Sequence, residues 1–216
     1  MNSALSSRVL AHRGHWKSEF GFKELGKNSV EAIHRAVELG FGIETDIRDY
    51  MGEVVISHDP ADETSLEFEK LLSIEIRGLV ALNVKSDGLA NKIESMFNSS
   101  KPNFEYFFFD MSYPEGRKYE SKRLPIANRK SEYERLPEVL SRDIWVDCFD
   151  SDWYTKNTDW FTNLDANNIV LVSPELHNRS HKESWKWITT QMTEHQNLFI
   201  CTDMPLEFLN FWEKQI

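Results

Sequence analysis

The stretch Gly42-Ile-Glu-Thr-Asp-Ile47 is acidic at two alternate positions and apolar or uncharged at the positions between them. In a strand, this period of two places Glu44 and Asp46 on one face and Ile43 and Ile47 on the other, with the two acidic α-carbons roughly 6.6 Å apart. Such a pair repels itself unless a positive charge lies nearby, and a hard divalent cation such as Mg²⁺ or Ca²⁺ prefers oxygen ligands of this kind. A solvent-facing edge of an amphipathic strand is the alternative explanation.

Similar short apolar runs recur along the chain, separated by segments with helical spacing. Several are rich in β-branched or aromatic residues, as expected of strands buried on both faces. The other runs are residues 8–11, 53–57, 79–84, 105–109, 144–148, 169–172 and 198–201. The helical segments are residues 29–39, 89–97, 184–193 and 206–212. We expect Asn28 to cap the first helix, with Glu31 completing the cap, and Gly40 to end it.

This alternation predicts an α/β protein with a largely parallel sheet. About eight runs in 216 residues favour a compact TIM-type (β/α)₈ barrel with outer helices. An open, doubly wound sheet is the competing architecture. The sequence holds no linker or repeat, so we expect one domain over residues 1–216.

Composition limits the classes of partner. The 25 basic and 35 acidic residues give a net charge of −10, which disfavours general nucleic-acid binding but allows one local basic phosphate site. Two cysteines exclude a disulfide scaffold and suit a reducing compartment. The sequence shows neither a signal-peptide pattern nor an apolar stretch long enough to span a bilayer. We therefore expect a soluble cytoplasmic protein without integral membrane association; the sequence specifies no oligomeric state.

Polar side chains that suit phosphate chemistry end several of the predicted strands. His12 and Arg13 follow the first run, and His58 follows the run at residues 53–57. Imidazole titrates near neutrality and can act as a general acid or base. Asn83 and Lys85 share one face of a further strand, where the lysine could contact a phosphate oxygen.

These residues together resemble the glycerophosphodiester phosphodiesterase family. The match in order, spacing and identity is carried by the motifs His12-Arg13-Gly14, Asn28-Ser29, Glu44-Thr-Asp46 and His58-Asp59. Thr202-Asp-Met-Pro205, after the last strand, is similar to the closing motif of the same family.

The resemblance implies a TIM-type barrel with its site at the carboxyl ends of the strands. It implies an enzyme, a phosphoric diester hydrolase acting on a small glycerol- or sugar-linked phosphodiester, in which a neighbouring hydroxyl of the substrate attacks phosphorus first. By this resemblance Glu44 and Asp46 are metal ligands for Mg²⁺ or Ca²⁺, and His12 and His58 move protons. Arg13 and Lys85 neutralise the phosphoryl group.

Two positions depart from the family pattern. Lys27 stands where the family has the glutamate of its Glu-Asn-Thr motif, and Asn83 stands where it has a third acidic metal ligand. An asparagine carbonyl can still bind Mg²⁺ or Ca²⁺, so Asn83 is the expected third ligand. The same two changes support an alternative, a catalytically degenerate barrel that binds a phosphorylated ligand. A metal-dependent hydrolase of the amidohydrolase type normally needs a His-x-His pair, which this sequence lacks.

The second half of the chain offers weaker candidates. Asp110 and Asp147 follow strands and could replace the missing acidic ligand, although a carbonyl ligand from Asn83 with extra water serves equally well. Glu175 or His177 could contribute a ligand or a head-group contact at the mouth of the barrel. An ordinary polar loop is the alternative for each.

Overall fold

The computed structural model describes residues 3–137, 141–156, 159–162 and 164–216. Its strands are β1 (Val9–His12), β2 (Gly42–Tyr50), β3 (Glu53–Ile56), β4 (Leu66–Glu67), β5 (Val80–Val84), β6 (Tyr106–Phe109), β7 (Ala127–Lys130), β8 (Asp143–Val146), β9 (Asn168–Val172) and β10 (Leu198–Thr202). Its α-helices are α1 (Ser3–Ser6), α2 (Val30–Glu38), α3 (Phe68–Leu72), α4 (Ala90–Ser100), α5 (Tyr113–Ser121), α6 (Asp159–Thr162), α7 (Lys182–Glu194) and α8 (Pro205–Glu213). Two 3₁₀ turns, η1 (Trp153–Thr155) and η2 (Pro174–His177), follow β8 and β9.

Eight strands run parallel to their neighbours in the order β6-β5-β2-β1-β10-β9-β8-β7. The two outer strands of this series, β6 and β7, meet in one parallel bridge between Phe108 and Ile126. β3 and β4 pair antiparallel beyond β2 and lie outside the series. The expected mixed α/β fold with a large, mainly parallel sheet is therefore confirmed.

One member of the predicted set of strands belongs elsewhere. The run at residues 53–57 was expected to be one of eight parallel strands, but β3 returns antiparallel along β2 as a hairpin. The eighth parallel strand is β7, whose sequence Ala-Asn-Arg-Lys carries no apolar run. Short apolar patterns do not encode strand direction, and the polar β7 lacks the pattern altogether.

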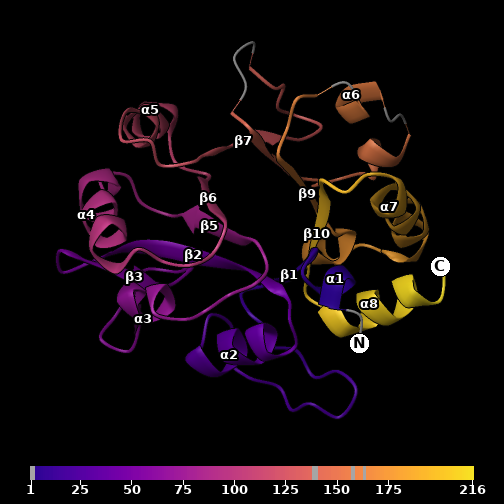
Figure 1. Ribbon diagram of the computed structural model, residues 1–216, viewed down its shortest axis with the longest axis horizontal. Coiled ribbons are helices and arrows are strands. Elements are labelled where there is room, and N and C mark those ends of the chain that lie inside the picture. Colours follow the sequence, from indigo (N-terminus) through magenta and orange to yellow (C-terminus); the bar gives the residue numbers. More distant parts are fainter. Residues whose placement is uncertain (1–2, 138–140, 157–158, 163) are drawn as a thin grey trace.

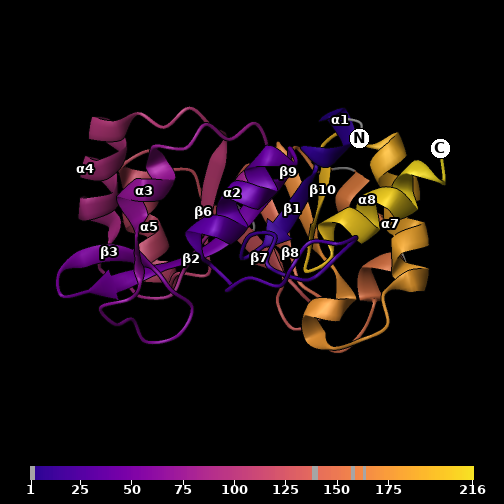
Figure 2. The ribbon, with the colours of Figure 1, turned by 90° about the horizontal axis from the view of Figure 1, so that it is seen from below.

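Helices cover the outside of the strands. α7 and α8 lie against β10 and β1, while α2 to α5 lie along β2, β3, β5 and β6 (Figure 1). The view from below shows α3, α4 and α5 at one end of the molecule and α7 and α8 at the other, with α2 between them (Figure 2). None of the helices in the described ranges is long and apolar enough to cross a bilayer.

The register of three neighbouring strands brings the expected site residues into adjacent positions. His12 of β1 pairs with Glu44 of β2, and Asp46 of β2 pairs with Asn83 of β5. These pairs lie at the carboxyl ends of β1 and β5. The expected convergence of strand ends on one edge of the sheet therefore follows from backbone pairing alone.

The start of α2 differs from the predicted cap. Ser29, not Asn28, is the N-cap, and its hydroxyl accepts a hydrogen bond from the Ala32 amide. Asn28 adopts a left-handed backbone conformation, with φ of 59°, and its side chain turns toward β2. Gly40 follows the helix with φ of 78°, as expected of a residue that ends a helix.

Gly42 allows β2 to pass close to the segment before β5. A β-carbon at Gly42 would lie 2.5 Å from the Leu79 carbonyl oxygen, which cannot move without disturbing the sheet. We expect Gly42→Ala to lower the free energy of unfolding by about 2–3 kcal/mol, the upper range for overpacking. Urea denaturation measures this change.

The matched control is Gly26→Ala, whose β-carbon would meet Ser29 at an ordinary 3.6 Å. It should change stability by less than about 1 kcal/mol. Equal effects of the two substitutions would contradict the close approach at Gly42.

Candidate active site

Asp46 lies at the centre of the strand-end cluster and is fully buried. Its Oδ2 atom is 3.0 Å from Arg13 Nε and accepts a 2.9 Å hydrogen bond from Asn28 Nδ2. Its Oδ1 atom is 3.3 Å from Lys85 Nζ. Two cations and an amide therefore compensate this carboxylate, which could not otherwise remain charged away from water.

Glu44 is only 1% exposed and has weaker compensation. Its Oε2 atom lies 3.8 Å from His12 Nε2 and 3.3 Å from the Arg13 amide nitrogen. Burial, reinforced by the charge of Asp46, raises the pKa of Glu44 to about 7. This carboxyl group would bind a further cation favourably, because a cation stabilises its charged form.

His12 is held by a carboxylate on the last strand. Its Nδ1 atom lies 2.7 Å from Asp203 Oδ1, and Trp16 Nε1 donates to the same oxygen. Burial opposes ionisation of Asp203, but the hydrogen bond and charge of His12, together with the charge of Lys27, lower its pKa overall. With Nδ1 engaged in this way, His12 turns Nε2 toward Glu44.

Lys27, one of the two positions that depart from the family pattern, lies beside the His12–Asp203 pair. Lys27 Nζ lies 4.3 Å from the centroid of the Trp16 ring, a cation–π contact. The basic residue therefore contacts Trp16 and acts on Asp203 through its charge. It adds positive charge on the β1–β10 side of the cluster.

Arg13 and Asn28 hold strained backbone conformations that fix the loop before α2. Both have φ of 59°, which costs a non-glycine residue of the arginine type about 1–2 kcal/mol. The Arg13 amide donates to the Glu44 carbonyl at 2.8 Å, and the Arg13 carbonyl accepts from the Asn28 amide at 2.8 Å. Asn28 Oδ1 also accepts from Thr45, so this loop clamps both faces of β2 near Asp46.

Asn83 fits the position of a third oxygen ligand. Its side chain hydrogen-bonds Asp110, and its Oδ1 atom is buried without a hydrogen-bond donor in the described chain. Asp46 Oδ1 is likewise buried, and the cation Lys85 Nζ lies 3.3 Å from it. Two buried oxygens on paired positions of neighbouring strands, beside the readily protonated Glu44, suit a hard cation.

Other acidic strand ends are already engaged. Within the described ranges, no three His, Cys, Asp or Glu side chains are arranged to hold a metal. Asp147 Oδ1 lies 2.6 Å from His177 Nε2, and Glu175 accepts hydrogen bonds from Ser173 and Thr202. The carboxylates of Asp147 and Glu175 are thus already paired within the described chain, while Asn83 Oδ1 is not.

His58 lies at the rim of the cluster and apart from the carboxylate pair. The neighbouring Ser57 amide donates to the Asp46 carbonyl at 3.0 Å, which anchors the end of the β2–β3 hairpin at the site. The His58 ring is 42% exposed and pairs with Asp59 at 3.0 Å. The structure thus joins His12, Arg13, Glu44, Asp46 and Lys85 by direct contacts and leaves His58 facing solvent beside them.

The fold of the chain is shared with two solved enzymes. A glycerophosphodiester phosphodiesterase from Parabacteroides distasonis superposes with a TM-score of 0.62 at 18% identity, over 96% of this chain and 97% of the other. A glycerophosphodiester phosphodiesterase from Agrobacterium tumefaciens superposes with a TM-score of 0.64 at 12% identity, over 94% and 99%. This chain has the glycerophosphodiester phosphodiesterase fold. No family model matches the sequence, and no curated protein is significantly similar to it.

Within this glycerophosphodiester phosphodiesterase fold, sequence reasoning did not assign Asp203 a role. The Thr202-Asp-Met-Pro205 motif was a usable signal, because it follows the last strand, and the register of β10 with β1 places it beside His12. The role of Asp110 as the partner of Asn83 left no comparable trace, since its φ of 68° and its contacts arise only in the folded chain.

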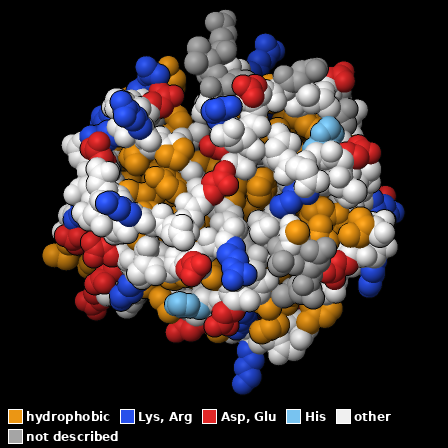
Figure 3. Space-filling view, in the orientation of Figure 1, with side chains coloured by type: hydrophobic (Ala, Val, Ile, Leu, Met, Phe, Trp, Pro, Cys, Tyr) orange, Lys and Arg blue, Asp and Glu red, His pale blue; other side chains and the backbone are white. Residues whose placement is uncertain are grey.

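Charge is mixed on the molecular surface in spite of the net −10. Figure 3 shows acidic and basic side chains interspersed on one face, with apolar side chains between them. Positive charge that could attract a phosphate is thus a local property of Arg13 and Lys85.

Protonation of Glu44 should make stability depend on pH. Its folded pKa of about 7 exceeds the ordinary 4.5, so between these values the folded protein holds a proton that the unfolded chain has lost. Stability contributed by this group is therefore lost as the pH rises through that window. We expect Glu44→Gln to raise the free energy of unfolding at pH 8 by about 1–3 kcal/mol in metal-free protein, and to change it little at pH 4.5.

Urea denaturation at the two pH values in chelator measures the difference. Glu53→Gln, on the exposed side of the hairpin, is the matched control. A stabilisation by Glu44→Gln that is equal at both pH values would show that protonation of Glu44 is not its cause.

Proposed function

We propose that the protein hydrolyses a small phosphodiester, glycerol- or sugar-linked, in a reaction that depends on a divalent metal. The observation that carries this proposal is the contact cluster of His12, Arg13, Glu44, Asp46 and Lys85 at the strand ends of a glycerophosphodiester phosphodiesterase fold. We also infer that the eight parallel strands, joined at Phe108 and Ile126, form a closed (β/α)₈ barrel in a single domain.

Glu44, Asp46 and Asn83 would hold Mg²⁺ or Ca²⁺. The metal would supply positive charge that stabilises the phosphoryl oxygens as negative charge develops on them. The proposal is supported by the buried Asn83 Oδ1 atom, which has no hydrogen-bond donor in the described chain, and by the raised pKa of Glu44.

Arg13 and Lys85 would bind the phosphoryl oxygens directly. Both reach Asp46 in the free protein, so a substrate phosphate would accept hydrogen bonds from cations that are already in place. Such preorganised charge requires little rearrangement when the substrate binds.

His12 would take the proton from the attacking hydroxyl group through Nε2. Asp203 at Nδ1 stabilises the imidazolium that results and fixes the ring orientation. His58 would donate a proton to the leaving alcohol from the rim, where the hairpin end is tied to Asp46.

Removal of either histidine tests these roles. We expect His12→Ala and His58→Ala each to lower kcat against glycerophosphodiesters by roughly 10²- to 10⁴-fold, with little change in KM. Chelator should abolish the wild-type rate, and Mg²⁺ or Ca²⁺ should restore it. The control is His34→Ala, an exposed position on α2.

Rates near wild type for both variants would exclude these assignments. Saturable binding of a phosphodiester without turnover, with any of the three metals Mg²⁺, Ca²⁺ and Mn²⁺, would instead support the degenerate barrel. Asn83 and Lys27 are the residues that favour that second reading.

Asn83 should determine the affinity for metal. Asn83→Glu adds a third negative charge, and we expect it to lower the half-saturating metal concentration by roughly tenfold. Asn83→Ala removes the oxygen and should raise that concentration. Thermal shift on titration with Mg²⁺ or Ca²⁺ measures both changes without relying on activity; identical titrations for all three proteins would remove Asn83 from the site.

A further inference from the structure

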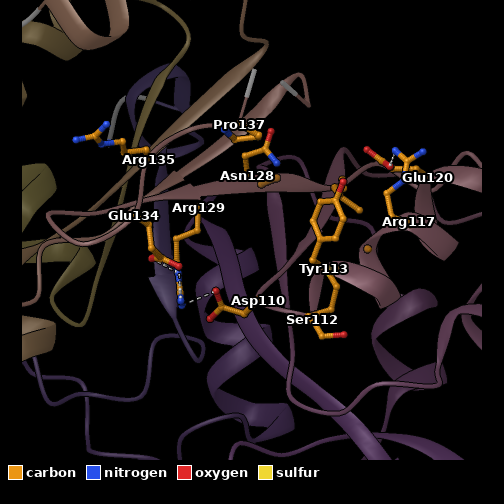
Figure 4. Close-up of a pocket in the computed structure, with 14 residues that line it drawn as sticks. Asp110, Ser112, Tyr113, Arg117, Glu120, Asn128, Arg129, Glu134, Arg135 and Pro137 are labelled. Carbon is orange, nitrogen blue, oxygen red and sulfur yellow. Dashed lines mark hydrogen bonds and ion pairs between the residues drawn. The ribbon is translucent and has the colours of Figure 1, made fainter. Parts of the chain in front are cut away.

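A hollow begins at Asp110, at the carboxyl-terminal end of β6, and extends between α5 and β7 as far as Glu120 and Ile126. This cleft, which we call the α5–β7 cleft, has a volume of about 710 Å³. One wall is a face of α5 formed by Tyr113, Gly116, Arg117 and Glu120, and the opposite wall comes from β7 and the residues after it (Figure 4). Its size is within the usual range of small-molecule sites.

Two features leave room for the cleft: the short pairing between β6 and the segment before β7, and the absence of a side chain at Gly116. In the described chain, β6 meets the segment that leads into β7 through one bridge, Phe108 with Ile126, and a hydrogen bond from the Phe108 amide to the Pro125 carbonyl. Along the cleft, α5 presents Gly116, although a glycine inside a helix costs about 0.5–1 kcal/mol relative to alanine. A β-carbon there would lie 3.7 Å from Met111, which is ordinary contact, so steric crowding does not require this glycine.

Asp110 joins the cleft to the candidate active site. It lines the cleft, hydrogen-bonds Asn83 and pairs with Arg129 at 2.9 Å. Figure 4 shows Arg129 between Asp110 and Glu134. Asp110 is thus the residue shared by the cleft and the surroundings of Asn83.

The charges that line the cleft cancel and are mostly paired. Arg129 binds Glu134 through Nε and Nη2 and Asp110 through Nη1, and Arg117 pairs with Glu120. An ammonium head group would therefore compete with an arginine for every carboxylate in the described lining. A quaternary ammonium needs an aromatic cage, but Tyr113 is the one aromatic side chain among the described lining residues.

Hydroxyl groups fit this lining better. Guanidinium groups and carboxylates keep donors and lone pairs beyond those used in their ion pairs, and a hydroxyl can serve either kind. Tyr113, 81% exposed at the edge, and Met111 offer apolar surface for the carbon face of a ring.

We propose that the α5–β7 cleft binds the alcohol arm of the phosphodiester substrate and that this arm is an uncharged ring carrying several hydroxyl groups. The proposal rests on the proposed function. In this proposal Gly116 keeps the cleft open. The paired charged side chains bind the hydroxyl groups of the ring.

Filling the cleft from Gly116 tests the proposal. We expect the wild type to hydrolyse glycerophosphoinositol with a kcat/KM at least tenfold above those for glycerophosphocholine and glycerophosphoethanolamine. Gly116→Leu should abolish this preference by raising KM for the inositol ester at least tenfold more than KM for the other two esters. Gly116→Ala, which adds one methyl group in ordinary contact, should retain wild-type values.

A second variant covers the case in which Gly116→Leu does not fold. Tyr113→Ala changes an exposed side chain and should raise KM for the inositol ester several-fold more than KM for the other two esters. A wild type without preference, or a cleft variant that slows all three esters equally, would overturn the proposal.

Binding of free inositol separates this proposal from the proposed function. Saturation-transfer NMR should detect inositol on the wild type and on Gly116→Ala, with the signal lost in Gly116→Leu or reduced in Tyr113→Ala, whether or not any ester is hydrolysed. Absence of hydrolysis of all three esters would refute the proposed function alone. Absence of inositol binding to the wild type would refute the cleft assignment.

Discussion

Glu44 and Asp46 place two carboxyl groups on one face of a strand that is buried along most of its length. Burial makes both charges costly, and each neighbouring element supplies part of the compensation. Arg13 and Lys85 reach Asp46 from the strands on either side, while Glu44 is left with a pKa near 7. The loop before α2 exists in its strained form to bring Arg13 and Asn28 to this face. The weakly compensated Glu44 makes the cluster suited to a cation, and the cations Arg13 and Lys85 beside it suit a phosphate.

The candidate site is arranged in two parts around this pair. His12 belongs to the strand series and is fixed by Asp203, so its geometry is as rigid as the sheet. His58 is carried by the β2–β3 hairpin, which lies outside the parallel series and is tied to it by the Ser57 amide. On the far side, Asp110 connects the same cluster to the α5–β7 cleft. In the proposed complex, one end of a bound diester would thus contact the sheet at His12, and the other end would face the α5–β7 cleft.

The sequence predicted the parts of the fold whose pattern is local. The period of two in residues 42–47 predicts a strand, and the same six residues contain the acidic pair. The polar β7 has no such pattern, because pairing with β8 rather than hydrophobicity makes it a strand. Residues 53–57 were recognised as a strand but given the wrong direction. Contacts between distant residues, such as His12 with Asp203, depend on register that a single sequence does not display.

The pairing of β1 with β10 joins Val9 to Ile200, so the first strand finds its neighbour in the last. During synthesis, β1 emerges long before β10, and the position beside β1 stays unpaired until β10 has been made. Closing a loop of this length makes assembly slow, because the entropy of chain closure precedes the contacts that reward it. His12 acquires its carboxylate partner in that same late event. A chain cut before β10 therefore keeps the other seven parallel strands but lacks the carboxylate that orients His12.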